Sequence, residues 1–265
     1  MNTGIIVFLL VVGLVALLVS RKKRGKKMHF PKSVHPESER HFRAIGGTDG
    51  ALLRDVNNLI IDLHQNALWD RITNLCVVHT SLADTLVDVK GSQNSAASGS
   101  PTFSSTTGVE CRLSGSKYVD MQTLPANEED SSVFVYMDDV SGTLDRIFGG
   151  IIYVCQRIGG DWSGSYAGGT AAIETTATVS GLFGISRTSS ASVNLHADGT
   201  TTVQASTRSG NIANDCLVGG ANVFGYSGGS DINAGAWGQA DGFVDADWQL
   251  LKTAVEKYLT ARGFI

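Results

Sequence analysis

Residues 50–65 carry apolar side chains with the spacing of an amphipathic helix. The apolar positions recur at i, i+3, i+4 and i+7, and polar residues occupy the positions between them. We therefore predict a helix over 50–65, with Thr48 or Asp49 as its N-cap. The apolar stripe comprises Leu52, Leu53, Val56, Leu59, Ile60 and Leu63.

Beyond residue 75 the apolar residues form short runs that are separated by clusters of Gly, Ser, Asn and Asp. This pattern is typical of an all-β domain. Residues 92–105 are low in charge and in apolar bulk, so we predict a loop with a short strand at its end. The predicted strands are Cys76–His79, Leu86–Val89, Gly108–Leu113, Lys117–Met121, Ser132–Asp138, Ile147–Gln156 and Leu182–Ser186.

A hairpin is predicted further along the chain. Ser192–Ala197 and Thr200–Ser206 flank Asp198 and Gly199. These two residues tolerate a positive φ, which the two-residue turn of a hairpin requires.

The chain ends with a second helical pattern. Asp245 is the predicted cap, and Gly263 supplies the left-handed position that ends a helix. We expect this helix to pack on the β-rich region through one apolar stripe, formed by Trp248, Leu251, Val255, Tyr258 and Leu259.

The N-terminus carries an uncharged apolar run at residues 4–20, followed at once by a basic run. Its length falls at the lower end of the ~17–25 residues that span a bilayer as a helix. A cleaved signal peptide is the alternative, but its positive charge would precede the apolar run. We therefore expect a single membrane span whose cations stay cytoplasmic and contact anionic headgroups. The cations are Arg21, Lys22, Lys23, Arg24, Lys26 and Lys27.

These patterns divide the chain into three parts. Residues 1–27 form the anchor with its basic stop. Residues 28–49 are polar, contain Pro31 and Pro36, and are predicted to be a linker. Residues 50–265 form the helix and the β-rich domain.

Charge and composition exclude several classes of function. The whole chain has net charge −4 even with the basic run included, so nucleic-acid binding by the remainder is not expected. The four cysteines are widely separated and include no CxxC pair, which favours buried free thiols. The six histidines form no HExxH motif or close ligand pair, so we predict neither a metal nor a cofactor.

Four stretches from about Asn66 to the C-terminus carry a resemblance to a known family. They are NALWDRITNLCVV with GSPTFSSTTGVECRLSGSKYVD, then SVFVYMDDV, GISRTSSASVNLHADGTTTVQAS and DWQLLKTAVEKYLTARGF. This part of the chain resembles the concanavalin A-like, laminin-G-like sandwich domains of many bacteriophage structural proteins. The resemblance implies a mainly β jelly-roll sandwich with a preceding helix and a C-terminal helix. Domains of this kind bind glycans or proteins, and some sandwiches of the superfamily hydrolyse polysaccharides.

Catalytic motifs are missing from the sequence. A glucanase of this architecture would carry an E-x-D-x-x-E-like strand, and no such strand occurs. The acidic run 128–130 fits a solvated turn. Asp138 and Asp139 fit the end of a strand, with a cap or turn role favoured over calcium ligation. There is no GxSxG motif. We therefore predict binding without catalysis.

Two glycine-rich segments carry aromatic residues that suit stacking on a sugar or on a protein partner. We predict mobile loops that display Trp162 and Tyr166 in the first segment and Tyr226 and Trp237 in the second. The alternative is that these aromatics close the ends of the sandwich core.

The sequence thus favours a membrane-anchored structural or spike-like attachment protein of a membrane-containing bacteriophage. Its expected partners are the lipid membrane and either a glycan or a capsid protein, and a homo-oligomer is an open expectation. Its expected location is the virion membrane or the host inner membrane, with the C-terminal domain initially cytoplasmic. A cellular inner-membrane protein with a partner-binding sandwich and a glycan hydrolase remain as alternatives.

Overall fold

The computed structural model describes residues 30, 33–112, 116–122, 130–140, 146–149, 153–158, 161–166, 172–174, 180–189, 191–205, 216–222, 226–229 and 231–265. The chain divides into two compact units, residues 1–33 and 34–265. All elements named below belong to the second unit. The predicted span at 4–20 and the basic run at 21–27 lie outside the described residues. Within the described part of the chain, no helix has the length and apolar character needed to cross a membrane.

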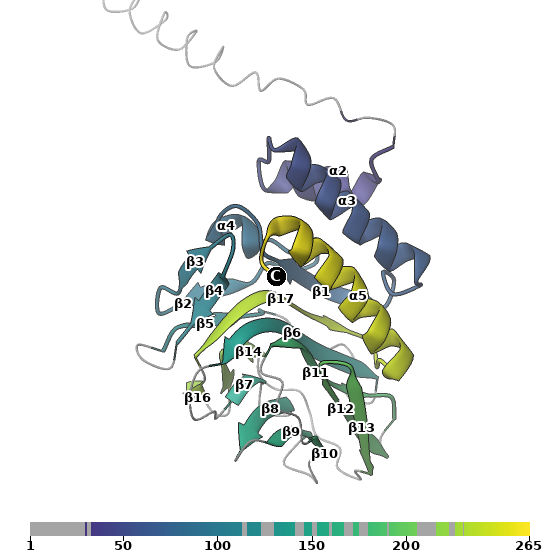
Figure 1. Ribbon diagram of the computed structural model, residues 1–265, viewed down its shortest axis with the longest axis vertical. Coiled ribbons are helices and arrows are strands. Elements are labelled where there is room, and N and C mark those ends of the chain that lie inside the picture. The colour runs from purple at the N-terminus through teal and green to yellow at the C-terminus, as the bar shows by residue number, and fades with distance from the viewer. Residues whose placement is uncertain are drawn as a thin grey trace, which may run out of the picture. The chain divides into compact units, whose positions relative to one another are not determined.

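Two antiparallel sheets form the body of the second unit (Figure 1). The first sheet has the order β13 (Thr200–Ala205), β12 (Ser192–Ala197), β11 (Gly181–Arg187), β6 (Ser131–Val140), β17 (Ile232–Ala240), β4 (Gly108–Cys111) and β3 (Thr102–Ser104), and β1 (Ile72–Val77) also pairs with β17. The second has the order β10 (Ala172–Glu174), β9 (Asp161–Tyr166), β8 (Tyr153–Ile158), β7 (Arg146–Gly149), β14 (Leu217–Val218), β5 (Tyr118–Asp120) and β2 (Ala96–Ser98). β15 (Gly220–Asn222) and β16 (Tyr226–Gly229) form a separate ribbon.

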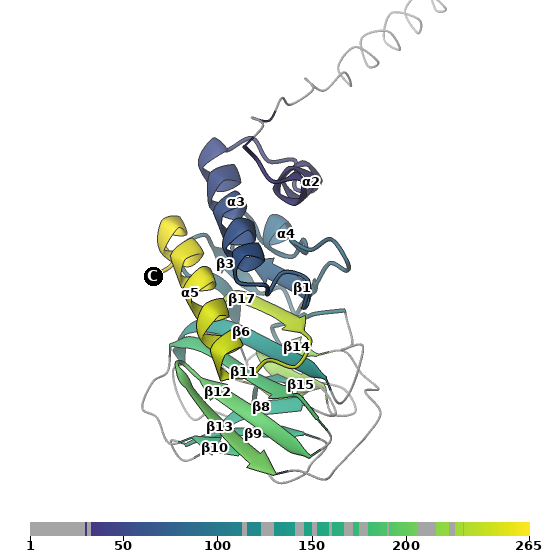
Figure 2. The same ribbon diagram turned by 90° about the vertical axis from the view of Figure 1, so that its right-hand side faces the viewer.

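Helices lie on one side of this sandwich. α5 (Asp245–Arg262) runs along the first sheet, and α3 (Gly50–Gln65) and α2 (Pro36–Ala44) lie beyond it, while β8, β9 and β10 lie on the opposite side (Figure 2). The short α4 (Leu82–Thr85) follows β1. The unit is therefore a β-sandwich with a helical layer on one sheet, which agrees with the mainly β fold and the two flanking helices predicted from the sequence.

Strand β6 of the first sheet is buried on both faces. Val133 and Val135 belong to the core between the sheets. The alternate residue Phe134 instead meets Trp248 of α5 edge-to-face, with ring centroids 6.4 Å apart. Because successive strand residues point to opposite faces, this apolar run serves both interfaces.

Gly184 makes room for the helix on the neighbouring strand β11. A Cβ atom at this position would approach the Trp248 ring to 2.3 Å. The missing side chain therefore lets the largest aromatic residue of α5 lie directly on the sheet.

The core between the sheets joins residues from both. Burial raises the pKa of the Cys76 and Cys111 thiols to about 12. These two cysteines and Cys216 are buried and form no disulfide, as predicted, and the Cys155 side chain lies outside the described side chains. The buried cluster comprises Cys76, Val109, Cys111, Val119, Met121, Val133, Val135, Met137, Phe183, Ile185, Val193, Leu195, Ala197, Cys216, Val218, Ile232, Ala234 and Trp237.

Several local predictions are confirmed. α3 spans the predicted residues, and the Asp49 carboxylate caps it by accepting a hydrogen bond from the Ala51 N–H at 2.8 Å. β12 and β13 form the predicted hairpin, with Asp198 at φ +40° and Gly199 at φ +104° in its turn.

The predicted strand Leu86–Val89 is wrong. These residues follow α4 and form a turn and a loop. The Asp88 carboxylate organises this loop because it accepts hydrogen bonds from the backbone N–H groups of Leu75 (2.8 Å) and Ser92 (2.6 Å). A polar side chain that satisfies the backbone in this way replaces the hydrogen bonds of a sheet.

The predicted linker is also partly wrong, because residues 36–44 form α2. Its inward face consists of Ser38, His41 and Phe42. Since two of these three residues are polar, the segment has no stripe of apolar side chains that would mark a helix. The folded unit begins at Val34, earlier than the boundary at residue 50 that the sequence suggested.

The final helix is confirmed over 245–262, and its predicted apolar stripe is buried. Asp245 is its first residue and not its cap. The carboxylate of Asp247 accepts a hydrogen bond from the Val244 N–H at 2.9 Å. Gly263 ends the helix at φ +72°.

Candidate functional site

Trp237 does not display its ring to a ligand. It lies in the centre of β17 and is 0% exposed. Its indole N–H donates to Ser95 Oγ at 3.0 Å. The prediction of a binding role is therefore wrong for Trp237, and its alternative, a place in the core, is correct. Glycine-rich sequence is typical of a loop, but β17 is a central strand. Its Gly238 packs closely against the neighbouring strand β1.

Trp162 and Tyr166 lie on strand β9 and not in the predicted loop. β9 pairs with β8 without interruption from Asp161 to Tyr166. Both aromatic side chains lie outside the described side chains. Their binding role and its alternative, a place in the core, therefore both stay predictions.

Tyr226 begins β16 in the two-stranded ribbon, opposite Asn222. Its side chain lies outside the described side chains, so its binding role also stays a prediction. The acidic candidates have structural partners where they are described. Asp138 accepts from Ser180 Oγ at 2.8 Å, and Asp130 accepts from the Gly242 N–H at 2.8 Å.

The helical layer contains a buried hydrogen-bonded chain of two histidines and a tyrosine. Tyr258 Oη donates to the Val78 carbonyl at 2.7 Å and lies 2.8 Å from His79 Nδ1. The hydroxyl proton of Tyr258 is used in the bond to the Val78 carbonyl. His79 Nδ1 must therefore carry a proton and donate it to Tyr258 Oη. His79 Nε2 is then an acceptor and receives the His41 Nε2–H at 2.8 Å. The His79 ring is therefore neutral.

Burial favours this neutral state. It lowers the pKa of His41 to about 4 and that of His79 to about 3. The hydrogen bonds between His41, His79 and Tyr258 join α2, the segment after β1, and α5 in the interior. Their role is therefore to hold the helical layer on the sheet.

A second histidine cluster lies nearer the surface, where the start of α2 meets the end of α3. His64 Nε2 lies 3.0 Å from Glu37 Oε2, and His35 Nδ1 lies 3.6 Å from the same oxygen. One ligand atom from each of these three residues falls within 4.8 Å of the other two. Two imidazoles and a carboxylate in this arrangement are able to hold a metal ion.

Neighbouring groups hold the cluster. The backbone N–H of His35 donates to Asn57 Oδ1 of α3 at 2.7 Å. The His64 ring lies 5.3 Å from the Trp69 ring. Burial raises the pKa of Glu37, but hydrogen bonds from the His64 and Trp69 side chains outweigh burial and lower the pKa overall.

The sequence did not reveal this cluster. Glu37 and His64 are separated by 27 positions, and residues 28–49 were expected to be a linker. The available signal was the His35-Pro36-Glu37 sequence, which suits the first turn of a helix because proline is favoured there.

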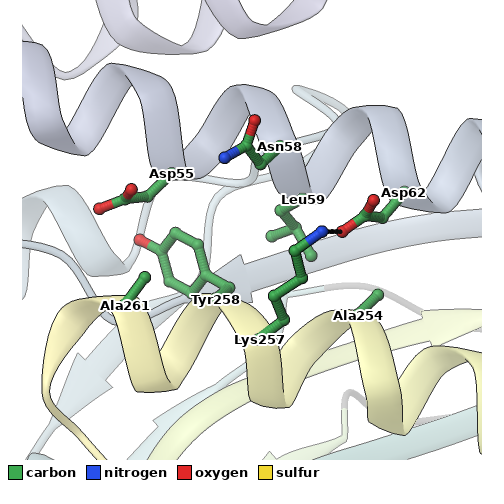
Figure 3. A pocket seen from close by; sticks show the side chains of 8 residues that line it. All are labelled: Asp55, Asn58, Leu59, Asp62, Ala254, Lys257, Tyr258 and Ala261. Atoms are coloured by element: carbon green, nitrogen blue, oxygen red, sulfur yellow. Dashed lines mark hydrogen bonds and ion pairs between the residues drawn. The ribbon is translucent and has the colours of Figure 1, made fainter.

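A small pocket lies between α3 and α5 (Figure 3). Asp55 and Asp62 reach into it from α3, and Lys257 and Tyr258 reach into it from α5. Lys257 Nζ pairs with Asp62 at 2.7 Å. The pocket has a volume of about 80 Å³, whereas pockets for drug-sized ligands occupy roughly 300–1,000 Å³. We therefore regard it as a packing gap bridged by an ion pair.

Comparison with known proteins bears on the fold. No family model matches the sequence, and comparison with curated proteins gives no match. The structure is similar to a mutant of Trypanosoma rangeli sialidase displaying trans-sialidase activity, with TM-score 0.52, 8% identity, and coverage of 84% of this chain and 38% of that chain. The chain thus spans well under two thirds of the sialidase's length. This likeness shows a shared β-sandwich.

Two further solved structures are similar at a lower level. Domain 4 of AbnA, a GH43 extracellular arabinanase from Geobacillus stearothermophilus in complex with arabinotriose, gives TM-score 0.48 and 11% identity over 69% of this chain and 98% of that chain. The binding domain of Paraclostridial Mosquitocidal Protein 1 gives TM-score 0.48 and 10% identity over 69% of this chain and 52% of that chain.

Proposed function

We propose that this chain is a membrane-anchored protein whose β-sandwich binds carbohydrate. The observation that carries the proposal is the two-sheet antiparallel sandwich, which is similar to part of a sialidase. A sialidase acts on carbohydrate, and a sandwich of the concanavalin A-like, laminin-G-like type, which the sequence resembles, fits the same class of ligand. Function belongs to a site and not to a fold, so the proposal requires a direct binding test.

The N-terminal sequence supports attachment to a membrane. The apolar run at 4–20 is followed by six cations within residues 21–27, and the folded unit begins at Val34. Such a run has the length of a membrane span, and the cations favour the cytoplasmic leaflet. We place the sandwich initially on the cytoplasmic side, in a host inner membrane or in a virion membrane derived from it.

The resemblance to phage sandwich domains supports a virion context for this architecture. In that context the chain is a structural or spike-like attachment protein that reaches a glycan or a capsid protein. Mass spectrometry of gradient-banded, membrane-containing virions tests this context. Recovery of the chain from uninfected cell membranes would instead support the cellular alternative.

We propose binding without hydrolysis. A retaining glycosidase needs two carboxyl groups that face the substrate about 5 Å apart. Among the described residues, Asp198 and Glu256 both contact Lys252 Nζ, at 3.4 and 2.6 Å, where α5 lies on the sheet. Their pairing with a lysine suits a structural role.

The binding test uses a chain that begins at Val34 and purified bacterial peptidoglycan and surface polysaccharides. We expect saturable binding by at least one polysaccharide and no release of reducing ends. Absence of binding to every preparation would overturn the carbohydrate proposal. Released oligosaccharide would make the protein a hydrolase.

Aromatic variants then locate the contact. Trp162→Ala, Tyr166→Ala and Tyr226→Ala are compared with Val203→Ala, a control on β13 whose side chain is 65% exposed. Replacing a residue that stacks on sugar should weaken the affinity for the polysaccharide about tenfold and leave the midpoint of unfolding unchanged. Replacing a core residue should instead lower that midpoint.

A further inference from the structure

We propose that His35, Glu37 and His64 form a binding site for a divalent zinc-like ion that clasps α2 to α3. The inference is independent of carbohydrate binding, since the three residues lie in the helical layer and not on the second sheet. It rests on the positions of three ligand atoms and on the chemistry of those atoms.

The separations fit a tetrahedral metal site. Zinc bonds to nitrogen and oxygen are about 2.0–2.1 Å long, so ligand atoms at tetrahedral corners lie about 3.3 Å apart. Glu37 Oε2 lies 3.0 Å from His64 Nε2 and 3.6 Å from His35 Nδ1. All three ligand atoms lie within 4.8 Å of one another. A rotation of the His35 ring that releases Nδ1 from the Glu37 N–H, from which it accepts at 3.4 Å, would bring the three atoms around one ion.

The donor set selects the kind of ion. Two imidazole nitrogens and one carboxylate suit zinc and other borderline transition metals. Calcium and magnesium prefer sites built from oxygen atoms. Because the three side chains are partly exposed, water is able to fill a fourth position.

The surroundings hold the ligands in place, as supporting groups do at metal sites. The Trp69 side chain donates to Glu37. The Asn57 amide oxygen accepts from the backbone N–H of His35, which holds the start of α2 against α3. Lys90 Nζ lies 4.5 Å from the Trp69 ring centroid and donates to the Trp69 carbonyl at 2.5 Å. Its positive charge near the cluster opposes a cation, so we expect moderate affinity.

The site would tie two distant segments together. His35 and Glu37 belong to the start of α2, and His64 lies in the last turn of α3. An ion that binds the folded state and not the unfolded state raises stability, and the gain grows with the logarithm of the free ion concentration once that concentration exceeds Kd. Zinc should therefore strengthen the attachment of the first helix of the folded unit.

The test uses the untagged full-length chain in detergent, stripped of metal with a chelator. Titration calorimetry with ZnCl2 should give saturable binding of one ion per chain. Glu37→Gln and His64→Gln should each weaken zinc affinity about 100-fold. Loss of a residue that only supports a metal ligand costs about 10–100-fold, and loss of a ligand should cost at least as much. Glu39→Gln is the matched control, because Glu39 lies on the same helix and pairs with Arg43 instead. It should bind zinc as the wild type does.

Two further measurements keep the result decisive if a variant folds poorly. Co²⁺ added to the wild type should give visible d–d absorption of tetrahedral intensity that ZnCl2 abolishes, and MgCl2 should not compete. Circular dichroism in chelator shows which variants keep their helices. The proposal is overturned if folded wild type binds no zinc saturably, or if a folded His35→Gln, His64→Gln double variant keeps wild-type affinity.

Discussion

At the scale of residues, Leu251 and Leu250 are neighbours on α5 that differ in burial. Leu251 is 0% exposed, whereas Leu250 is 36% exposed. Leu251→Ala should lower the free energy of unfolding by ~2–5 kcal/mol, because it removes buried methyl groups and leaves a cavity. Leu250→Ala should change it by less than ~0.5 kcal/mol. Urea denaturation measures both, and equal losses would contradict the packing of α5.

The buried pair His41 and His79 should make stability depend on pH. Burial lowers the pKa of these histidines to about 4 and about 3 in the folded state, from about 6.5 in the unfolded chain. The unfolded chain therefore binds more protons below about pH 6.5, so stability is fully present above that pH and is lost as pH falls toward 4. His41 alone accounts for a loss on the order of 3 kcal/mol.

Urea denaturation at pH 7.5 and pH 5 tests this expectation. His79→Gln removes one titrating group and should reduce the difference between the two pH values. His196, whose pKa burial also lowers to about 4, leaves part of the difference in place. The charged groups that act on the pair are Asp84, Asp88, Arg40 and Arg262. A variant with the same pH dependence as the wild type would exclude His79 from the effect.

At the scale of elements, the sequence predicted those helices and turns whose conformation depends on neighbouring residues in the chain. α3 and α5 have periodic apolar stripes and end signals, and the hairpin turn has two residues that tolerate positive φ, so each was predictable from its own sequence. β9 was not, because its glycines and serines resemble a loop until β8 and β10 pair with it. α2 was not, because two of its three buried positions are polar, and His41 finds its partner on another element.

The same distinction applies to the candidate site. Trp237 was named as a ligand contact, yet long-range pairing of β17 with β1 and β6 places it in the core. The cluster of His35, Glu37 and His64 depends on how α2 crosses α3, and no spacing in the sequence encodes that crossing directly.

Removal of α2 tests its place in the folded unit. A chain that begins at Gly46 should be less stable than one that begins at Val34, because it lacks the buried His41 and Phe42 side chains. Loss of an aromatic side chain from a core costs about 3–5 kcal/mol, so we expect a loss of at least that order. Urea denaturation of both chains measures it. Equal stability would restore the linker that the sequence predicted for residues 28–49.

At the scale of the whole molecule, attachment and folding are assigned to different parts of the chain. The contacts described above lie within 34–265, which is one compact unit. That unit has a sandwich core and a helical layer that bury their apolar residues against each other. The apolar run at 4–20 has no counterpart among the described helices. We therefore expect the two parts to be separable by truncation.

The full chain should sediment with membranes after a high-salt wash, and the chain that begins at Val34 should stay in the supernatant. Val12→Arg places a charge near the centre of the apolar run, at a cost of about 2.5–3.5 kcal/mol for insertion, so it should reduce the membrane-bound fraction. Ser20→Arg is the matched control, because it merely extends the basic run that begins at Arg21, where a long cationic side chain reaches the headgroups. If the chain from Val34 sediments with membranes after the same wash, attachment belongs to the sandwich and not to the N-terminal run.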